Sequence, residues 1–436
     1  MGLLKSRNDA GGLPAVAQPI LAKAEKRRAP RRKSSTKLTC PSPSTSPLEG
    51  RVDRWVAALI HWFDTHARKL PWRRTLDPYG IWISEIMLQQ TQVKTVIPYW
   101  ERWMQELPDA TALADARPER VLKLWEGLGY YTRARNLQRA AQEIVQQHGG
   151  SFPTEFSAIL ALPGIGRYTA GAISSIAFNH PNPILDGNVI RVLTRLLGIK
   201  TNARERKTLE RLWAVATLLV QAAGRNFPSG KSKSTSAAAA RTSSSGLVSS
   251  GPCSRLNQAL MELGATLCLP RQPQCVRCPL QQDCHARASG HPEQFPNLGR
   301  RLAPTARFFQ AFLLEHEGKW LAVQRPANVV NARLWEFPNI EVREGADPAR
   351  SAQQLLGIGA LRQAQGGALN LAPFRTIRHS ITRYRIALEA FRMQLQTRPP
   401  ATPHLEPTAR WLSLPDLERL PFASAHRQLL KDLFLD

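Results

Sequence analysis

The chain has 436 residues, which is enough for two or three domains with separate hydrophobic cores. Its 59 Lys and Arg side chains outnumber its 33 Asp and Glu side chains, and the formal net charge of +26 indicates a polyanionic partner such as nucleic acid. Six cysteines in this length disfavour a disulfide scaffold, and the lack of a long apolar run disfavours a membrane protein.

Residues 1–50 predict a disordered basic tail, because they are rich in Pro, Ser, Arg and Lys and poor in aromatic side chains. The basic block at residues 26–33 is compatible with a nuclear signal, an arm that binds nucleic acid, or a solvated tail. A transit peptide is a further alternative, which the acidic Asp9 and Glu25 disfavour.

Residues 51–223 show the apolar periodicity of α-helices, so we expect an all-α region. Asp77 followed by Pro78 predicts a helix start, with Asp77 as the N-cap. Five apolar residues at helical spacing predict the buried face of another helix: Val189, Val192, Leu193, Leu196 and Leu197.

Between two helical patterns, residues 162–167 read Leu-Pro-Gly-Ile-Gly-Arg and predict a tight hairpin. Gly164 and Gly166 allow the backbone to approach a ligand closely. The unpaired N–H groups of the next helix, which should begin near Arg167, would favour a DNA phosphate. Asp186 lies where a helix N-cap is expected, and on its own it is interpreted as a structural cap.

Residues 228–254 predict a flexible insertion, because they contain three consecutive serines and four consecutive alanines. Cys253 falls in this stretch and Cys40 in the tail, so we expect neither cysteine to be structured. Residues 1–49 carry a net charge of +7 and residues 224–254 carry +4, which leaves about +15 on the rest of the chain. The basic bias therefore belongs to the folded body too.

Four cysteines give the strongest chemical signal, and six, two and five residues separate them in turn: Cys268, Cys275, Cys278 and Cys284. Thiolates this close can converge on one metal centre, either a cubane iron–sulfur cluster or a tetrahedral zinc ion. Zinc motifs commonly begin with two cysteines about two to four residues apart, so the first gap favours the cluster. Disulfides or unligated thiols are the remaining alternative.

After Pro304 the pattern changes to short β-rich segments, which predict a separate α+β domain. The predicted strands are Phe308–Leu314, Trp320–Val323 and Tyr384–Phe391. A connector containing Pro and Arg near residues 295–301 is the expected boundary, which gives domains at residues 51–300 and 301–436.

Five segments occur together and in one order along the chain: Ser84–Val93, Gly127–Tyr131, Leu162–Arg167, Leu185–Val189 and the four-cysteine segment. On these segments the chain resembles the MutY family of adenine DNA glycosylases, in the helix-hairpin-helix superfamily. The resemblance covers residues 51–300 closely and residues 301–436 more loosely, through Leu334–Pro338 and His379-Ser380.

The resemblance implies a multi-domain fold, with an all-α helix-hairpin-helix glycosylase core, a [4Fe–4S] cluster loop, and a Nudix-like α+β domain that recognises 8-oxoguanine. It implies an enzyme that flips adenine out of duplex DNA and excises it when it is mispaired with 8-oxoguanine or guanine. Residues 340–360 lack a Nudix hydrolase signature, so we expect no pyrophosphohydrolase activity. We expect a monomer that binds DNA and no membrane, in the cytoplasm of a bacterium or in the nucleus or mitochondrion of a eukaryote.

The same resemblance assigns catalytic roles to Glu85 and Asp186. Glu85 would protonate adenine N7 and help to activate water, whereas Asp186 would stay ionised and stabilise positive charge on the sugar, with a low pKa kept by hydrogen bonds. Tyr168 and Asn188 match positions that orient the catalytic groups. Relatives that cleave the DNA backbone carry a lysine where this chain has Tyr168, and Ile190 replaces a lysine of some members, so we expect a monofunctional glycosylase.

Further matches concern DNA contact. Gln90 and Tyr130 match residues that enter the DNA helix around the lesion, although Tyr130 is also compatible with a core position. In the loop that reads the lesion, many members carry Phe-Ser-His where this chain has Ile381-Thr382-Arg383. Thr382 keeps a hydroxyl for the oxidised base and Arg383 can contact phosphate, so we expect altered lesion discrimination.

Two other functions fit parts of the sequence. A pyrimidine-lesion glycosylase and lyase of the endonuclease III type is disfavoured by Tyr168 and by the C-terminal domain. A non-catalytic protein that binds lesions is disfavoured by the presence of both Glu85 and Asp186.

Overall fold

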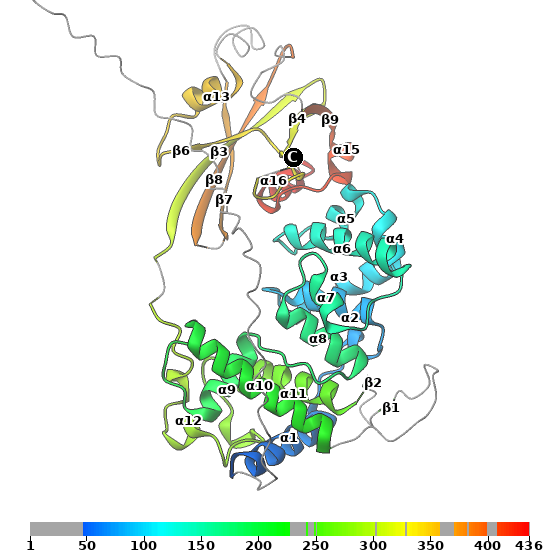
Figure 1. Ribbon diagram of the computed structural model, residues 1–436. Coiled ribbons are helices and arrows are strands. Elements are labelled where there is room, and N and C mark those ends of the chain that lie inside the picture. The colour runs from blue at the N-terminus through cyan, green and yellow to red at the C-terminus, as the bar shows by residue number, and fades with distance from the viewer. Residues whose placement is uncertain are drawn as a thin grey trace, which may run out of the picture.

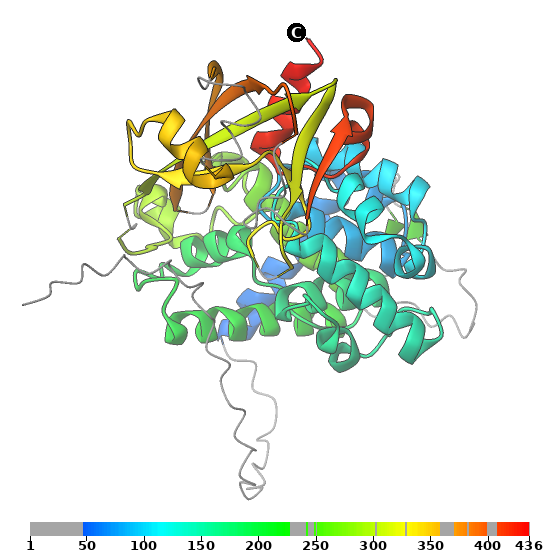
Figure 2. The same ribbon diagram turned by 90° about the horizontal axis from the view of Figure 1, so that it is seen from above.

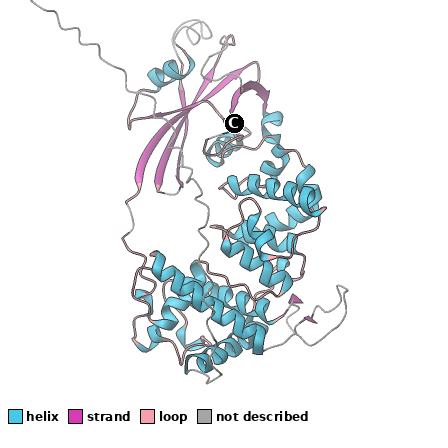
Figure 3. Ribbon diagram, in the orientation of Figure 1, coloured by secondary structure: helices cyan, strands magenta, loops and turns pink. Residues whose placement is uncertain are grey.

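The computed structural model describes residues 47–226, 241–242, 248–249, 251–300, 303–327, 329–357, 370–381, 383–398 and 408–435. A helical part occupies the first two thirds of the chain, and a domain built on one large β-sheet occupies the last third (Figures 1 and 3). None of the described helices is both long and apolar enough to cross a lipid bilayer.

Helices make up nearly all the regular structure that is described before residue 300, which confirms the predicted all-α region. They are α1 (Pro47–His66), α2 (Pro78–Leu88), α3 (Val93–Glu106), α4 (Ala110–Asp115), α5 (Pro118–Leu124), α6 (Thr132–His148), α7 (Phe156–Ala161), α8 (Arg167–Phe178), α9 (Gly187–Leu197), α10 (Arg206–Asn226), α11 (Pro252–Thr266) and α12 (His285–Ala288). Short 3-10 turns lie at Pro71–Arg73, Cys275–Arg277 and Pro292–Gln294.

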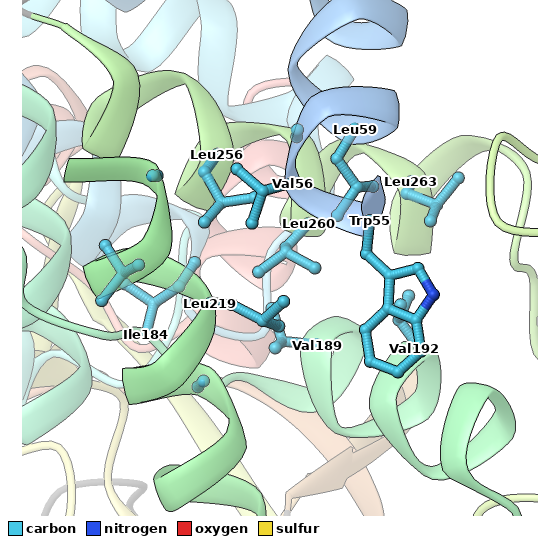
Figure 4. Close-up of a cluster of buried hydrophobic side chains, with 14 of the residues drawn as sticks. Trp55, Val56, Leu59, Ile184, Val189, Val192, Leu219, Leu256, Leu260 and Leu263 are labelled. Carbon is cyan, nitrogen blue, oxygen red and sulfur yellow. The ribbon is translucent and has the colours of Figure 1, made fainter. Parts of the chain in front are cut away.

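These helices form two bundles with separate hydrophobic cores. The first core is formed mainly by α1, α9, α10 and α11 and includes the side chains labelled in Figure 4: Trp55, Val56, Leu59, Ile184, Val189, Val192, Leu219, Leu256, Leu260 and Leu263. The second core is formed mainly by α2 to α8 and contains three fully buried tryptophans, Trp82, Trp103 and Trp125. Since α8 packs against both α2 and α11, it joins the two bundles.

Local capping signals fix where two important helices begin. The Asp77 carboxylate accepts hydrogen bonds from the backbone N–H groups of Tyr79 (3.1 Å) and Gly80 (2.9 Å), so α2 starts as predicted. The Asp186 carboxylate accepts one from the N–H of Val189 (2.7 Å) at the start of α9. Of the five apolar positions predicted for α9, four are buried and Leu197 is partly buried.

Two boundaries predicted from the sequence are wrong. Helix α1 begins at Pro47, inside the tail predicted for residues 1–50. Helix α11 begins at Pro252, so the end of the insertion predicted for residues 228–254 is helical. Proline is favoured in a first helical turn because its missing N–H costs no hydrogen bond there. Most of both predicted segments lies outside the described residues.

Cys253 corrects another expectation. Its side chain lies in α11 with 1 % exposure, packed in the core of the first bundle, and its thiol donates a weak hydrogen bond to the carbonyl oxygen of Val220 (3.6 Å). Burial raises the pKa of this thiol to about 11. It is a small apolar core residue in an ordered helix. Nearby, β1 (Arg241–Thr242) and β2 (Val248–Ser249) pair in antiparallel fashion.

The C-terminal domain is built on a mixed seven-stranded sheet, which confirms the predicted α+β class. Its strands are β3 (Thr305–His316), β4 (Lys319–Gln324), β5 (Trp335–Glu336), β6 (Asn339–Val342), β7 (Ala372–Ile381), β8 (Tyr384–Gln394) and β9 (Ala409–Ser413). Only β3 and β8 pair in parallel among the described strands. The helices α15 (Leu414–Arg419) and α16 (Ser424–Leu433) pack in one apolar core of the domain, and α13 (Pro348–Leu356) packs in a second.

The sheet domain packs on the second helical bundle (Figures 1 and 2). Its residues Leu334 and Ala423 are buried in the core of that bundle. The Glu126 carboxylate accepts a hydrogen bond from the backbone N–H of Phe422 (2.8 Å), and the Tyr131 hydroxyl donates to the Phe422 carbonyl oxygen (3.3 Å). The two parts therefore share buried apolar and polar contacts near the loop that follows α5.

Candidate active site

A cavity of about 670 Å³ lies where the two helical bundles meet, and it gathers all four predicted catalytic residues. Glu85 reaches it from α2, Tyr168 from α8, and Asp186 and Asn188 from the start of α9. These four residues are brought together although more than 100 positions separate Glu85 from Asp186 in the chain. A volume of this size is typical of a site for a small ligand or an extruded base.

Glu85 is buried, with 5 % exposure, so it is not an ordinary exposed helix carboxylate. The Tyr168 hydroxyl donates a 2.7 Å hydrogen bond to Oε2 of Glu85 and also contacts Sδ of Met261 at 3.2 Å. Burial raises the pKa of Glu85 to about 7, aided by the nearby charge of Asp186 and opposed by the Tyr168 hydrogen bond and the charge of Arg73. The group is therefore poised to hold a proton near neutral pH.

Asp186 serves both as a helix cap and as a cavity residue. Besides the N–H of Val189, it accepts a hydrogen bond from Nδ2 of Asn188 (2.9 Å). Burial raises its pKa, while these hydrogen bonds and the charge of Arg191 lower it. Burial is the larger effect, so the expectation that hydrogen bonds keep this pKa low is wrong.

Arg191 links the N-terminal end of α9 to the cysteine segment. Its Nη2 donates to Oδ1 of Asn188 (2.8 Å) and to the carbonyl oxygen of Gly264 (2.7 Å). Its Nε donates to the carbonyl oxygen of Cys268 (2.7 Å). The orientation of Asn188, and through it that of Asp186, thus depends on the position of the cysteine segment.

Sequence analysis missed a group of charged residues at the same cavity. Glu262 of α11 has 1 % exposure, and Arg68 binds both of its carboxylate oxygens (2.8 Å each). The buried Arg73 donates to Glu262 (3.0 Å) and to Oε1 of Gln258 (3.1 Å). Burial opposes ionisation of Glu262, but the two arginines outweigh it and lower the pKa to about 2. The sequence did contain a signal for this buried charge, because Glu262 is a single acidic residue between Met261 and Leu263 on an apolar helix face.

No lysine lies among the described residues that line this cavity. Tyr168 occupies the predicted position after the hairpin, and Ile190 packs against the core of the first bundle. The cavity therefore offers carboxyl, hydroxyl, amide and guanidinium groups to a substrate and no primary amine for a Schiff base.

A second cavity, of about 280 Å³, is lined by Gln90, Tyr130 and Gly164 among others. Gln90 (φ 59°) and Tyr130 (φ 48°) both adopt the left-handed backbone conformation, which costs roughly 1–3 kcal/mol for a residue with a side chain. Such strain is often found at functional sites. The Tyr130 side chain is 42 % exposed, so the core alternative for this residue is wrong.

Glycines shape the two loops at this second cavity. Gly127 has φ 103°, and a Cβ there would lie 2.3 Å from the Tyr99 hydroxyl oxygen. Gly164 has φ 77°, and its Cβ would lie 2.6 Å from Cβ of Asn136. Only glycine fits either position without movement of a neighbour.

The predicted hairpin between α7 and α8 is present. Gly166 is the exposed N-cap of α8 and has no side chain to cap the helix, so the first N–H groups of α8 lack a side-chain partner. Such N–H groups can bind a phosphate. The exposed Arg167 lies over the indole ring of Trp213, 4.0 Å from the ring centroid.

The four predicted ligand cysteines line one small cavity of about 30 Å³ and are partly buried. Beside them Arg195, with 2 % exposure, donates to Sγ of Cys268 (3.3 Å) and to the carbonyl oxygen of Leu269 (2.7 Å). A buried guanidinium compensates negative thiolate charge. In the described part of the chain no three His, Cys, Asp or Glu side chains are arranged to hold a single metal ion. Four cysteines around one cavity are the donor set of an iron–sulfur cluster.

Of the two residues predicted to read the lesion, Thr382 lies outside the described residues. Arg383 is exposed in the connection between β7 and β8, and its guanidinium lies over the Tyr384 ring at 5.1 Å. Its Nη2 donates to the Tyr384 hydroxyl (3.1 Å). The position leaves Arg383 accessible to a ligand.

Comparison with known families defines the class of protein. Residues 83–217 match the model of the HhH-GPD superfamily of base excision DNA repair proteins, and residues 310–432 match the NUDIX domain. The first match spans the Glu85, Tyr168 and Asp186 cavity, and the second spans most of the sheet domain. The fold and site are therefore those of a base excision repair glycosylase joined to a Nudix domain.

Curated relatives give the family. The human adenine DNA glycosylase is 31 % identical, with 87 % of this chain and 74 % of the human protein covered. The Arabidopsis thaliana adenine DNA glycosylase is 36 % identical over 69 % of this chain and 50 % of the relative. The Buchnera aphidicola (Acyrthosiphon pisum) adenine DNA glycosylase is 35 % identical over 66 % of this chain and 75 % of the relative. The chain belongs to the adenine DNA glycosylase family.

Proposed function

We propose that the protein hydrolyses the N-glycosidic bond of adenine mispaired with 8-oxoguanine or guanine in duplex DNA. In this proposal residues 51–300 excise the base and residues 301–436 read the lesion. The observation that carries it is the presence in one cavity of Glu85, with a pKa of about 7, and Asp186, held by hydrogen bonds.

Glu85 acts as the acid. Near neutral pH a large share of Glu85 is protonated, so it can donate to adenine N7 and improve the leaving group. The Tyr168 hydroxyl fixes one carboxyl oxygen, which orients the other relative to the base. After the base departs, the carboxylate can accept a proton from the attacking water.

Asp186 stabilises the sugar. Cleavage of the glycosidic bond leaves positive charge on the deoxyribose, and an ionised carboxylate in a site of low dielectric lowers the energy of that state. Hydrogen bonds from Asn188 and Val189 hold the carboxylate in place. The positive charge that Arg191 brings nearby favours the ionised form.

DNA is held and distorted outside this cavity. Gln90 and Tyr130 act as wedges that occupy the stack when the adenine leaves it. The N–H groups at Gly164 and Gly166, with Arg167, bind a phosphate. In this proposal the Thr382 hydroxyl binds the oxidised base, and the exposed Arg383 binds a phosphate.

The four cysteines would hold one [4Fe–4S] cluster. The four-thiol donor set fits an iron–sulfur cluster, and the buried Arg195 would compensate its thiolate charge. Bound there, a cluster would order the cysteine segment. The segment in turn positions α9 through the Arg191 hydrogen bond to Cys268.

The proposal is tested with single-turnover release of adenine from duplexes that carry adenine opposite 8-oxoguanine, guanine or thymine, with alkali to reveal abasic sites. We expect release from the first two, and a loss of about 10²–10⁴-fold in Glu85→Gln and Asp186→Asn, since proton transfer and charge stabilisation are removed. Near-normal release by either variant contradicts the assignment. Covalent trapping to DNA by borohydride would instead favour the endonuclease III type of lyase.

A further inference from the structure

One arginine of α6 joins the two loops that carry Gln90 and Tyr130. Nη1 of Arg133 donates to three carbonyl oxygens at the end of α2 and just beyond it: Ile86 (2.7 Å), Met87 (3.2 Å) and Gln89 (2.6 Å). Nη2 of Arg133 donates to two carbonyl oxygens of the other loop: Leu128 (3.0 Å) and Gly129 (3.2 Å). A single guanidinium therefore connects the segments immediately before both wedge residues.

Two aromatic rings, those of Trp125 and Tyr130, also contact this guanidinium. Its Cζ lies 5.1 Å from the ring centroid of Trp125, which is fully buried, and 5.7 Å from that of Tyr130, which is exposed. Cation–π attraction thus connects Arg133 directly to the Tyr130 wedge. Burial lowers the pKa of Arg133 to about 10, so the side chain stays charged at neutral pH.

The backbone of both wedge segments requires a hydrogen-bond donor such as this guanidinium. Carbonyl groups at the end of a helix lack intrahelical partners and carry partial negative charge, which applies to Ile86 and Met87 at the end of α2. Gln90 and Tyr130 are both held in the left-handed backbone conformation, which persists only where neighbouring groups enforce it. Arg133 binds the carbonyl group of the residue before each of them, Gln89 and Gly129.

We propose that Arg133 is a positioning residue that fixes the distance between the Gln90 and Tyr130 wedges, so that both enter the DNA stack in one step and the adenine is extruded. This rests on the proposed function, since the wedges act only on a flipped base. Arginine suits the role because its planar fork presents two N–H edges at once, whereas the compact ammonium of lysine reaches one loop or the other.

The test measures base extrusion separately from cleavage. In a Glu85→Gln background, which blocks excision, 2-aminopurine replaces the target adenine opposite 8-oxoguanine, and its fluorescence rises when it leaves the stack. Arg133→Lys and Arg133→Gln are compared with the matched control Arg139→Lys, an exposed arginine on the same helix. Fluorescence is read at saturating protein, so a modest loss of affinity or a small unfolded fraction does not alter the result.

We expect the control to keep the full rise. A tenfold loss in the extrusion equilibrium takes a half-extruded base to about one in ten, so the rise in both Arg133 variants should fall to roughly a fifth. Duplex affinity should change by less than about threefold, because no phosphate contact is removed. An undiminished rise overturns the proposal, and so does a failure of both variants to bind duplex, which would make Arg133 a folding residue only. No adenine release by the unmodified protein would instead refute the proposed function.

Discussion

The carboxyl group of Glu85 lies in the protein interior, and its burial makes the stability of the fold depend on pH. Its pKa is raised in the folded protein, so the folded state binds this proton more tightly than the unfolded chain does. The stability that the proton supplies is full below the unfolded pKa near 4.5 and is lost as the pH rises through about 7. A functional carboxyl therefore destabilises the fold at alkaline pH.

Glu85→Gln should for this reason stabilise the protein at pH 8 while abolishing excision. A shift from 4.5 to about 7 corresponds to about 3.5 kcal/mol as an upper bound, because each pKa unit is worth about 1.4 kcal/mol. Denaturant unfolding at pH 8 and pH 5 measures the difference, with Glu101→Gln, an exposed acid of α3, as the control. A gain at pH 8 no larger than at pH 5 would contradict the pKa assignment.

Thr382 and Arg383 give a prediction about lesion choice. If the Thr382 hydroxyl binds the oxidised base, Thr382→Val should weaken binding of duplexes with 8-oxoguanine severalfold more than duplexes with guanine, since a lost hydrogen bond is worth roughly 0.5–1.5 kcal/mol. Arg383→Ala should weaken both equally and reduce the salt dependence, as for a phosphate contact. Titration of both duplexes at two salt concentrations decides this, and equal losses for the valine variant would exclude Thr382 from discrimination.

At the scale of elements, α9 joins the catalytic cavity to the cysteine segment. Asp186 caps its first turn, Arg191 reaches the carbonyl of Cys268, and Arg195 reaches the Cys268 sulfur and the following backbone. The N-terminal end of the helix thus positions the Asp186 carboxylate, while Arg191 and Arg195 further along it contact the cysteine segment. The state of the cysteine segment should therefore affect the orientation of Asp186.

Arg195→Met should make the cluster easier to lose. Removal of the guanidinium leaves thiolate charge uncompensated, and the loss of a residue that supports metal ligands typically weakens metal binding about 10–100-fold. Anaerobically purified protein should contain about four irons per chain, and a chelator should bleach its visible absorbance about tenfold faster in this variant. Arg287→Met, an exposed arginine at the same cavity, serves as the control. Equal bleaching rates would contradict this role for Arg195.

Elements with local signals could be predicted, and those that depend on distant contacts could not. Asp77, Asp186 and the glycine hairpin specify their own turns, so α2, α9 and the start of α8 were predicted near their observed positions. Glu262 and Arg73 pair across 189 positions, and no local pattern carries that contact. The start of α11 was not predicted, because it follows a serine-rich and alanine-rich stretch. Burial of Cys253 there depends on packing against α10, which is distant in the sequence.

For the whole molecule, Glu126 makes a polar contact between the glycosylase and Nudix domains. Its carboxylate accepts from the Phe422 backbone N–H (2.8 Å) and from Nζ of Lys123 (2.9 Å), and it lies 3.4 Å from Nε of Arg427. The next residue in the chain, Gly127, begins the loop that carries Tyr130. The contact between the domains thus lies next to the loop of Tyr130, one of the two proposed wedge residues.

Glu126→Gln should reduce the advantage of 8-oxoguanine over guanine. The amide cannot accept from all three donors, so one buried donor is left unpaired at a cost of about 1–3 kcal/mol and docking of the Nudix domain weakens. Single-turnover rates on both duplexes measure the ratio, with Glu119→Gln, an exposed acid on α5, as the control. An unchanged ratio would show that lesion reading does not require this contact.

If Glu85 is the acid and Asp186 the anion of one cavity, adenine release should depend on the ionisation of both groups. The most direct measurement is the single-turnover rate of adenine release from an A:8-oxoguanine duplex as a function of pH, at constant ionic strength. We predict a bell: the rate rises as Asp186 ionises and falls about tenfold per pH unit above about 7, as Glu85 loses its proton. In Glu85→Gln the residual rate should lack the alkaline limb near pH 7. A wild-type rate that stays constant from pH 6 to about pH 9, or an alkaline limb near pH 7 that persists unchanged in Glu85→Gln, would contradict the assignment of Glu85 as the acid.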